Sequence, residues 1–185
     1  SKKRSSPSVR YVALILGMVI GGGVLTKTNA FFSIYLLPVS LILFNWKEKR
    51  IKDRLIRWIF YAFIAILITY GFYSILRLSP FFHIIGEKNA LFVYPLKEWI
   101  EHPFNFFIGN WKAVWDWSIR YMTWPVMLLA GGSFFITRSK IKEKLLLLAW
   151  FVIPGIALAI FGKTLYPRFI FFMTLSLLPL AAFSL

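Results

Sequence analysis

The chain has 185 residues, of which 59% are hydrophobic, 19% aromatic and only 16% charged. Soluble domains are about 45–50% apolar and about 25% charged, so this composition excludes an ordinary soluble globule and a disordered chain and indicates a membrane protein. The net charge of +15 would suit a nucleic-acid partner, but the cations lie in short gaps between apolar runs, which argues against one.

Six stretches without Lys, Arg, Asp or Glu predict an all-α fold, a polytopic membrane bundle of six transmembrane helices. They cover residues 11–26, 28–46, 58–76, 121–137, 145–162 and 169–185. A membrane helix needs about 17–25 mostly apolar residues, and polar flanking residues extend a short span by snorkelling. A signal peptide would explain the first stretch alone.

Small residues and prolines within these stretches predict how the helices pack and bend. Gly17 and Gly21 form a GxxxG pair, which lets a second helix backbone approach closely, although glycine is also simply common in membrane helices. Proline interrupts helical hydrogen bonding, so kinks or breaks are expected at four positions. These are Pro38, Pro125, Pro154 and Pro179.

The distribution of Lys and Arg predicts the orientation. Fourteen of the 22 lie in the short segments 2–10, 47–57 and 138–144, and the remaining eight lie on the other side of the predicted helices. Cytoplasmic loops carry the excess of Lys and Arg, so both ends are expected in the cytoplasm and the long loop 78–120 outside. The chain starts at a serine and stops inside an apolar run, and we expect it to be part of a longer protein.

The long loop 78–120 is rich in aromatic residues mixed with charges. Trp111, Trp115 and Trp117 suit a short helix in the headgroup region, or simply the aromatic belt found at that depth. His83 and His102 with a nearby carboxylate are a weak metal signal, and the absence of cysteine excludes a thiolate metal site. No metal or cofactor is therefore predicted.

Two outward turns carry cations at the membrane boundary. Lys27 lies in a short turn between two apolar stretches, where a lysine either snorkels or meets an anion such as a lipid phosphate. The last outward turn adds Lys163, Tyr166 and Arg168, and arginine suits bidentate phosphate recognition. Arg77 and His83 are candidates because they lie near the same outer boundary.

These two turns resemble motifs of the polytopic GT-C glycosyltransferases, which include the aminoarabinose transferases of lipid A and the protein O-mannosyltransferase-like enzymes. Residues 21–27, Gly-Gly-Gly-Val-Leu-Thr-Lys, resemble the family's "GLaxLTKg" turn. Residues 165–170, Leu-Tyr-Pro-Arg-Phe-Ile, resemble its later "pRYllp" turn. The chain departs from the family at Thr28, where a glycine is usual, and at Phe169, where a tyrosine is usual.

The resemblance implies transfer of a sugar from a polyprenyl-phosphate carrier to an acceptor on the outer side of the membrane. Lys27 and Arg168, with Tyr166, Lys163, Arg77 and His83 nearby, would then bind the lipid phosphate. The family's catalytic carboxylate lies in an earlier outer loop that this chain lacks, so we expect no catalytic residue here and no activity from this part alone. The resemblance and the lack of an N-x-S/T site favour a bacterial inner membrane.

Two other functions remain open. A transporter or flippase would also have six helices, kinking prolines and glycine contacts, but such proteins place polar groups near the bilayer midplane. A structural membrane subunit would use the long aromatic loop to bind a protein partner. The predicted partners are membrane lipid and a polyprenyl-phosphate-linked sugar, with no nucleic acid.

Overall fold

The computed structural model describes residues 8–102 and 104–185, and their regular elements are helices apart from one isolated bridge between Val93 and Gly162. The all-α prediction is therefore confirmed for this part of the chain. The helices form two compact units, the first ending at Phe82 and the second beginning at His83. Lys2, Lys3 and Arg4, which contribute to the predicted orientation, lie outside the described residues.

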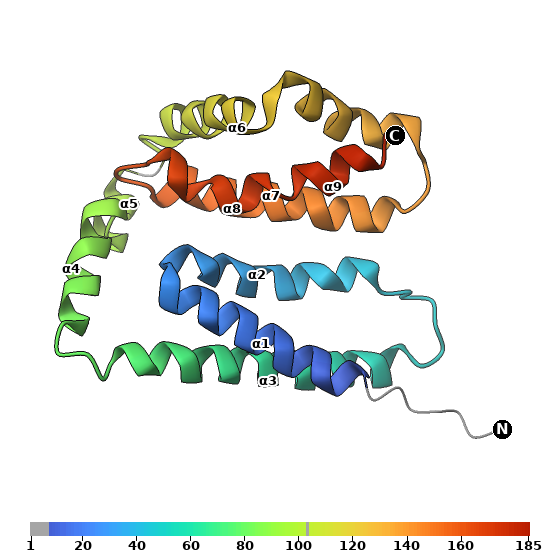
Figure 1. The fold of residues 1–185 in the computed structure, drawn as a ribbon, viewed down its shortest axis with the longest axis horizontal. Coiled ribbons are helices and arrows are strands. Elements are labelled where there is room, and N and C mark those ends of the chain that lie inside the picture. The colour runs from blue at the N-terminus through green and yellow to red at the C-terminus, as the bar shows by residue number, and fades with distance from the viewer. Residues whose placement is uncertain (1–7, 103) are drawn as a thin grey trace. The chain divides into compact units, whose positions relative to one another are not determined.

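The first unit consists of antiparallel helical segments (Figure 1). Its elements are α1 (Ser8–Thr26), η1 (Thr28–Phe31), α2 (Phe32–Val39), η2 (Ser40–Leu43) and α3 (Ile51–Leu76). Residues 28–46 were expected to form one helix. Instead 3₁₀ turns flank α2, and the helix that holds Pro38 ends one residue later. Pro38 has no backbone donor, so α2 lacks one helical hydrogen bond near its end.

The contact between α1 and α3 depends on two glycines. A Cβ atom added at Gly17 would lie 2.8 Å from the Ala65 carbonyl oxygen, and one at Gly21 would lie 2.8 Å from the Phe72 Cβ. The buried Thr69 hydroxyl bonds to the Ala65 carbonyl oxygen of its own helix at 2.9 Å and shares this proton with the Gly17 carbonyl oxygen, 3.3 Å away across the contact. The close approach predicted from the GxxxG pair is therefore confirmed.

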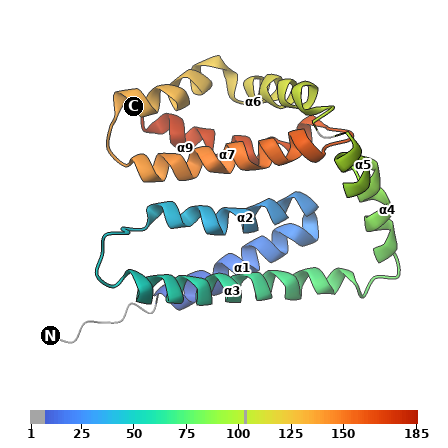
Figure 2. The ribbon, with the colours of Figure 1, turned by 180° about the vertical axis from the view of Figure 1, so that it is seen from behind.

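The second unit contains a long antiparallel helix pair and a returning segment (Figure 2). Its elements are α4 (Phe82–Phe92), α5 (Leu96–Glu101), α6 (Phe107–Ile136), α7 (Ile141–Phe161), η3 (Pro167–Phe169), α8 (Phe171–Thr174) and α9 (Leu177–Ala182). The segment from η3 to α9 returns beside α6 and α7 and closes their core.

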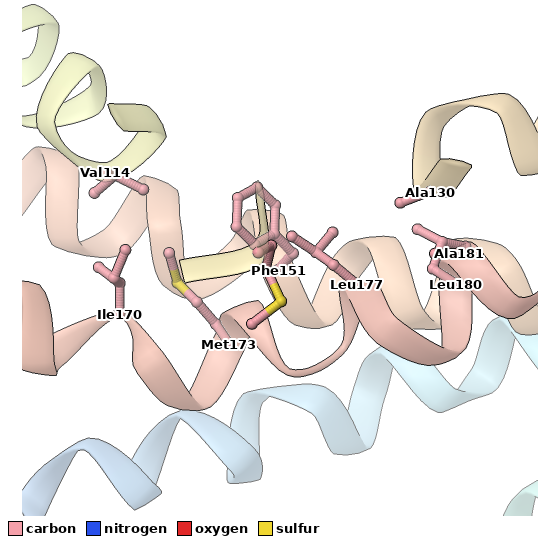
Figure 3. Packing of buried hydrophobic residues seen from close by; sticks show 9 residues of the cluster. Val114, Ala130, Phe151, Ile170, Met173, Leu177, Leu180 and Ala181 are labelled. Atoms are coloured by element: carbon pink, nitrogen blue, oxygen red, sulfur yellow. The ribbon is translucent and has the colours of Figure 1, made fainter. Parts of the chain in front are cut away.

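This core joins residues from three parts of the unit (Figure 3). Val114 comes from α6, Phe151 from α7, and Ile170, Met173 and Leu177 come from the returning segment. Ile170 and Met173 are completely buried. The same packing holds the turn between α7 and α8 at one end of the unit. This turn carries three of the predicted site residues.

Among the residues that the structure describes, two helices are long and apolar enough to cross a membrane. They are α3, with 26 residues and a mean hydropathy of 2.0, and α7, with 21 residues and a mean hydropathy of 2.3. Along one side of α3, Ile56, Phe60, Phe63 and Leu67 are each more than half exposed. An apolar stripe of this length suits contact with lipid. Shorter apolar helices cover Tyr11–Thr26, Asn29–Leu43 and Phe171–Ala182.

Several predicted boundaries differ from the structure. The helix expected at 121–137 begins at Phe107, and the one expected at 169–185 is divided into η3, α8 and α9. Charged residues end an apolar run without ending a helix, so the charge-free stretch 121–137 is much shorter than α6. Pro154 is buried inside α7, which continues past it, whereas the kink expected at Pro125 is a break in α6 at Thr123.

Thr123 adopts φ 66° and ψ 156°, a conformation that favours glycine. We therefore expect Thr123→Gly to raise the free energy of unfolding by about 1 kcal/mol, within the range for relief of such strain. Thr123→Ala removes the same hydroxyl but does not provide the conformational freedom of glycine, so it should not raise the free energy of unfolding. Thermal unfolding of both variants in detergent measures the difference, and equal melting temperatures would contradict the assignment of strain.

Lys144 is completely buried at the start of α7, although the sequence places it among exposed basic residues. Its ammonium donates to the carbonyl oxygens of Ser133 and Thr137, at the end of α6. The Phe183 ring lies 5.4 Å from the ammonium nitrogen. A cation suits the C-terminus of a helix, where carbonyl groups lack intrahelical partners. Lys144 therefore fastens α7 to the end of α6.

Candidate functional site

The first candidate group lies at one end of the first unit, where α1 ends and α3 ends (Figure 1). The Lys27 amide donates to the Gly23 carbonyl oxygen at 2.8 Å, and the Ala30 amide donates to the Lys27 carbonyl oxygen at 3.0 Å. These bonds form a tight turn in which Lys27 has an extended backbone and an exposed side chain. The turn thus presents the ammonium at the surface, at the end of a helix.

Aromatic contacts connect this turn to the end of α3. The rings of Phe31 and Tyr73 are 5.2 Å apart, and those of Tyr73 and Phe82 are 6.0 Å apart. The Arg77 guanidinium lies 5.9 Å from the Phe82 ring centre and is exposed. Lys27 and Arg77 therefore lie at the same end of the first unit. This agrees with the expectation that both residues are near the outer boundary of the membrane.

The second candidate group is the turn between α7 and η3, which is fixed by backbone hydrogen bonds to the segment after α4. The Tyr94 amide donates to the Phe161 carbonyl oxygen at 2.9 Å, and the Lys163 amide donates to the Phe92 carbonyl oxygen at 2.9 Å. The Asn110 side chain donates to the Gly162 carbonyl oxygen at 2.8 Å and to the Ala159 carbonyl oxygen at 3.2 Å. Asn110 thereby satisfies carbonyl groups at the end of α7.

The cations of this turn lie over aromatic rings. The Lys163 ammonium is 5.7 Å from the Tyr94 ring centre, and the Arg168 guanidinium is 5.2 Å from the Tyr166 ring and 5.5 Å from the Phe169 ring. Such contacts hold a cation in place while leaving its outer edge exposed. Phe169 therefore supports Arg168, even though it departs from the tyrosine of the resembled motif.

Tyr94 is the electrostatically perturbed group of this region. Its pKa lies above the usual 10.0 because burial disfavours the phenolate and because the Glu98 carboxylate is close. A phenol is already neutral at physiological pH, and the raised pKa extends this neutral range to higher pH.

The six predicted residues fall into two groups with His83 separate from both. Lys27 and Arg77 belong to the first unit, and Lys163, Tyr166 and Arg168 share one turn of the second unit. His83 is exposed in the first turn of α4. Within residues 8–102 and 104–185, no group of three His, Asp or Glu side chains is placed to hold a metal ion.

Sequence reasoning missed the aromatic and amide residues that position the second turn. Tyr94, Phe92 and Asn110 come from a segment about 50–70 residues earlier, and nothing in their local sequence marks a contact with residues 161–169. A polar Asn110 beside Trp111 in an aromatic-rich loop is the one available signal.

Comparison of the chain with protein-family models, with curated proteins and with solved structures finds no match. The proposed function therefore depends on the chemistry of the two turns and on the motifs they carry.

Proposed function

We propose that this chain is part of a membrane-embedded glycosyltransferase that transfers a sugar from a polyprenyl-phosphate carrier to an acceptor on the outer side of a bacterial inner membrane. In this proposal six segments cross or enter the bilayer and both ends face the cytoplasm. The elements α3 and α7 support it by their length and apolar surface. The shorter apolar helices would fill the thickness of the membrane together with their polar flanks.

The observation that carries the proposal is the pair of cationic turns at helix ends. Lys27 is exposed on a tight hydrogen-bonded turn, and Arg168 is exposed over two aromatic rings. Cations held at the ends of apolar helices suit the phosphate of a lipid whose tail remains in the membrane.

The chemistry follows from that binding mode. An acceptor hydroxyl attacks the anomeric carbon, the bond from that carbon to the phosphate oxygen breaks, and the polyprenyl phosphate leaves with the bonding electrons. A base outside this chain takes the hydroxyl proton. Cations of such a turn, Lys27 in the first unit or Arg168 in the second, would stabilise the negative charge that grows on the departing phosphate. We assign no catalytic residue to this chain.

The proposal predicts that Lys27→Ala and Arg168→Ala each weaken binding of polyprenyl phosphate by about tenfold, the loss expected when one charge-assisted contact is removed. The measurement uses the full-length protein in lipid nanodiscs, with polyprenyl phosphate as the ligand and uncharged polyprenol for comparison. Polyprenol should bind the variants and the parent protein equally, because it lacks the phosphate.

Lys49→Ala and Arg138→Ala are the matched controls, since both residues are exposed cations at the predicted cytoplasmic ends. They should leave polyprenyl phosphate binding unchanged. If Lys27→Ala and Arg168→Ala bind the phosphate as well as these controls do, the proposed site is wrong.

One observation favours the transporter or flippase alternative. The helix α6 is broken at Thr123, and discontinuous helices form many transporter binding sites. Reconstitution in sealed liposomes separates the two functions, because a flippase moves a fluorescent lipid between leaflets without any acceptor. A transferase releases free polyprenyl phosphate only when an acceptor is present.

A further inference from the structure

The first half of α6 has two opposite faces. Val114, Ser118 and Met122 recur every four residues and are buried against the unit. Lys112, Asp116 and Arg120 recur with the same spacing, displaced by two residues, and are exposed. Because two residues correspond to about 200° around a helix, the charged residues lie on the face opposite the core.

Contacts between α6 and α7 show which part of α7 lies beside the residues that carry this charged face. A Cβ atom at Gly155 would lie 3.2 Å from the Trp111 ring, and Asn110 bonds to carbonyl oxygens at 159 and 162. At the other end of the pair, Lys144 bonds to Ser133 and Thr137. The helices are antiparallel, so residues 112–120 lie beside the stretch of α7 between Lys144 and Gly155.

That stretch is the charge-free part of α7. If α7 crosses the membrane, residues 145–162 occupy the hydrocarbon layer, and Asp116 lies at the depth of the middle of that layer. The sequence instead places residues 112–120 in a loop above the membrane. The two arrangements are incompatible, because α6 cannot pack along α7 and also lie above it.

Contact with lipid would be costly for this face. A charged side chain at the centre of a membrane helix is costly, and Asp116 is too short to reach the surface by snorkelling. Its partner Arg120, at 2.9 Å, is 75% exposed, so the pair is not shielded by the unit. Water or a polar ligand satisfies these charges better than hydrocarbon does.

We propose that the face formed by Lys112, Asp116 and Arg120 lines a water-filled cleft that extends into the membrane on the side of α6 that faces away from α7. The cleft takes water and the charged or hydroxylated part of a ligand, and it does not hold an isoprenoid chain. Within the proposed transferase, on which this last assignment rests, it would admit the polar end of the donor or acceptor from the outer surface.

Cysteine accessibility tests the cleft directly, because the 185 residues contain no cysteine. Single variants Lys112→Cys and Asp116→Cys are made in the full-length protein without other cysteines and treated with a membrane-impermeant maleimide. Membrane fragments open on both faces are used, so the result does not depend on orientation. The reagent needs a thiolate, and an apolar environment suppresses the thiolate by raising the pKa of the thiol.

The expected result is labelling of both variants at a rate within about tenfold of Leu78→Cys, a highly exposed position after α3. Ile156→Cys, on an exposed position of α7 at a similar height, should remain unlabelled because it faces lipid. Unchanged elution of each variant in size-exclusion chromatography shows that the fold is retained, and Lys112→Cys replaces Asp116→Cys where the latter does not fold.

Two outcomes would overturn the proposal, and they have different meanings. If neither α6 position is labelled, lipid or protein covers the charged face. If Ile156→Cys is labelled as fast as Asp116→Cys, this part of α7 lies outside the membrane. Neither outcome affects the phosphate-binding comparison for Lys27 and Arg168, so failure of the cleft is distinguishable from failure of the proposed function.

Discussion

Replacement of Lys144 by methionine is expected to lower the free energy of unfolding by about 1–3 kcal/mol, since the carbonyl oxygens of Ser133 and Thr137 lose their bonds to the ammonium and a helix end loses its cation. The carbonyl oxygens of Ser133 and Thr137 both accept from the Lys144 ammonium, and the Ser133 oxygen also accepts from the Thr137 amide at 3.4 Å. Methionine fills a similar volume, so the change isolates hydrogen bonding and charge from packing.

Lys142→Met is the matched control, because Lys142 lies two residues away on the same helix and is exposed. Exposed substitutions usually change stability by less than about 0.5 kcal/mol. Thermal or denaturant unfolding in detergent, followed by helical circular dichroism, compares the two variants. Equal stability of Lys144→Met and Lys142→Met would show that the buried ammonium does not hold α6 and α7 together.

A second large effect is expected at Gly17. Gly17→Ala places a Cβ atom 2.8 Å from a backbone oxygen of α3, so α1 must move away, and we expect a loss of about 1–3 kcal/mol from overpacking. Movement of α1 also lengthens the 3.3 Å hydrogen bond from Thr69 to the Gly17 carbonyl oxygen. Gly17→Leu should be worse, because the larger side chain meets the same backbone.

Gly22→Ala provides a control with the opposite sign. A Cβ atom at Gly22 meets no described atom within 4 Å, and alanine in a helix is favoured over glycine by about 0.5–1 kcal/mol. Gly22→Ala should therefore be neutral or slightly stabilising in the same unfolding experiment. A destabilisation at position 22 equal to that at position 17 would contradict the assignment of close packing to Gly17, because helix propensity favours alanine at both positions.

Patterns local in sequence predicted much of this fold, and contacts between distant residues account for the rest. The long charge-free runs indicated α3 and α7, and the GxxxG pair indicated where a second helix would approach the first stretch, without showing that this helix is α3. The start of α6 was misplaced because Lys112, Asp116 and Arg120 end an apolar run, whereas Val114 and Ser118 continue a buried helical face. Hydropathy averages over both faces and hides the second pattern.

The candidate site was predictable to a similar degree. The turns that carry Lys27 and Arg168 stand out because short cationic segments separate apolar runs. Their supporting residues do not stand out, since Tyr94 meets Lys163 only through the bridge between Val93 and Gly162. Lys144 was misjudged for a related reason. In the sequence it belongs to a basic segment and is expected to be exposed, and only its bonds to carbonyl oxygens at the end of α6 show that it is buried.

The bridge between Val93 and Gly162 has a consequence for the order in which the second unit forms. The short connection 137–140 lets α6 and α7 meet early, whereas the bridge joins residues about 70 positions apart and closes a much longer loop. Contacts with a larger loop-closure entropy form later, once intervening helices have paired. We therefore expect the turn that holds Lys163 and Arg168 to acquire its geometry late, so that a partly folded chain would pair α6 with α7 before it forms the proposed anion-binding surface.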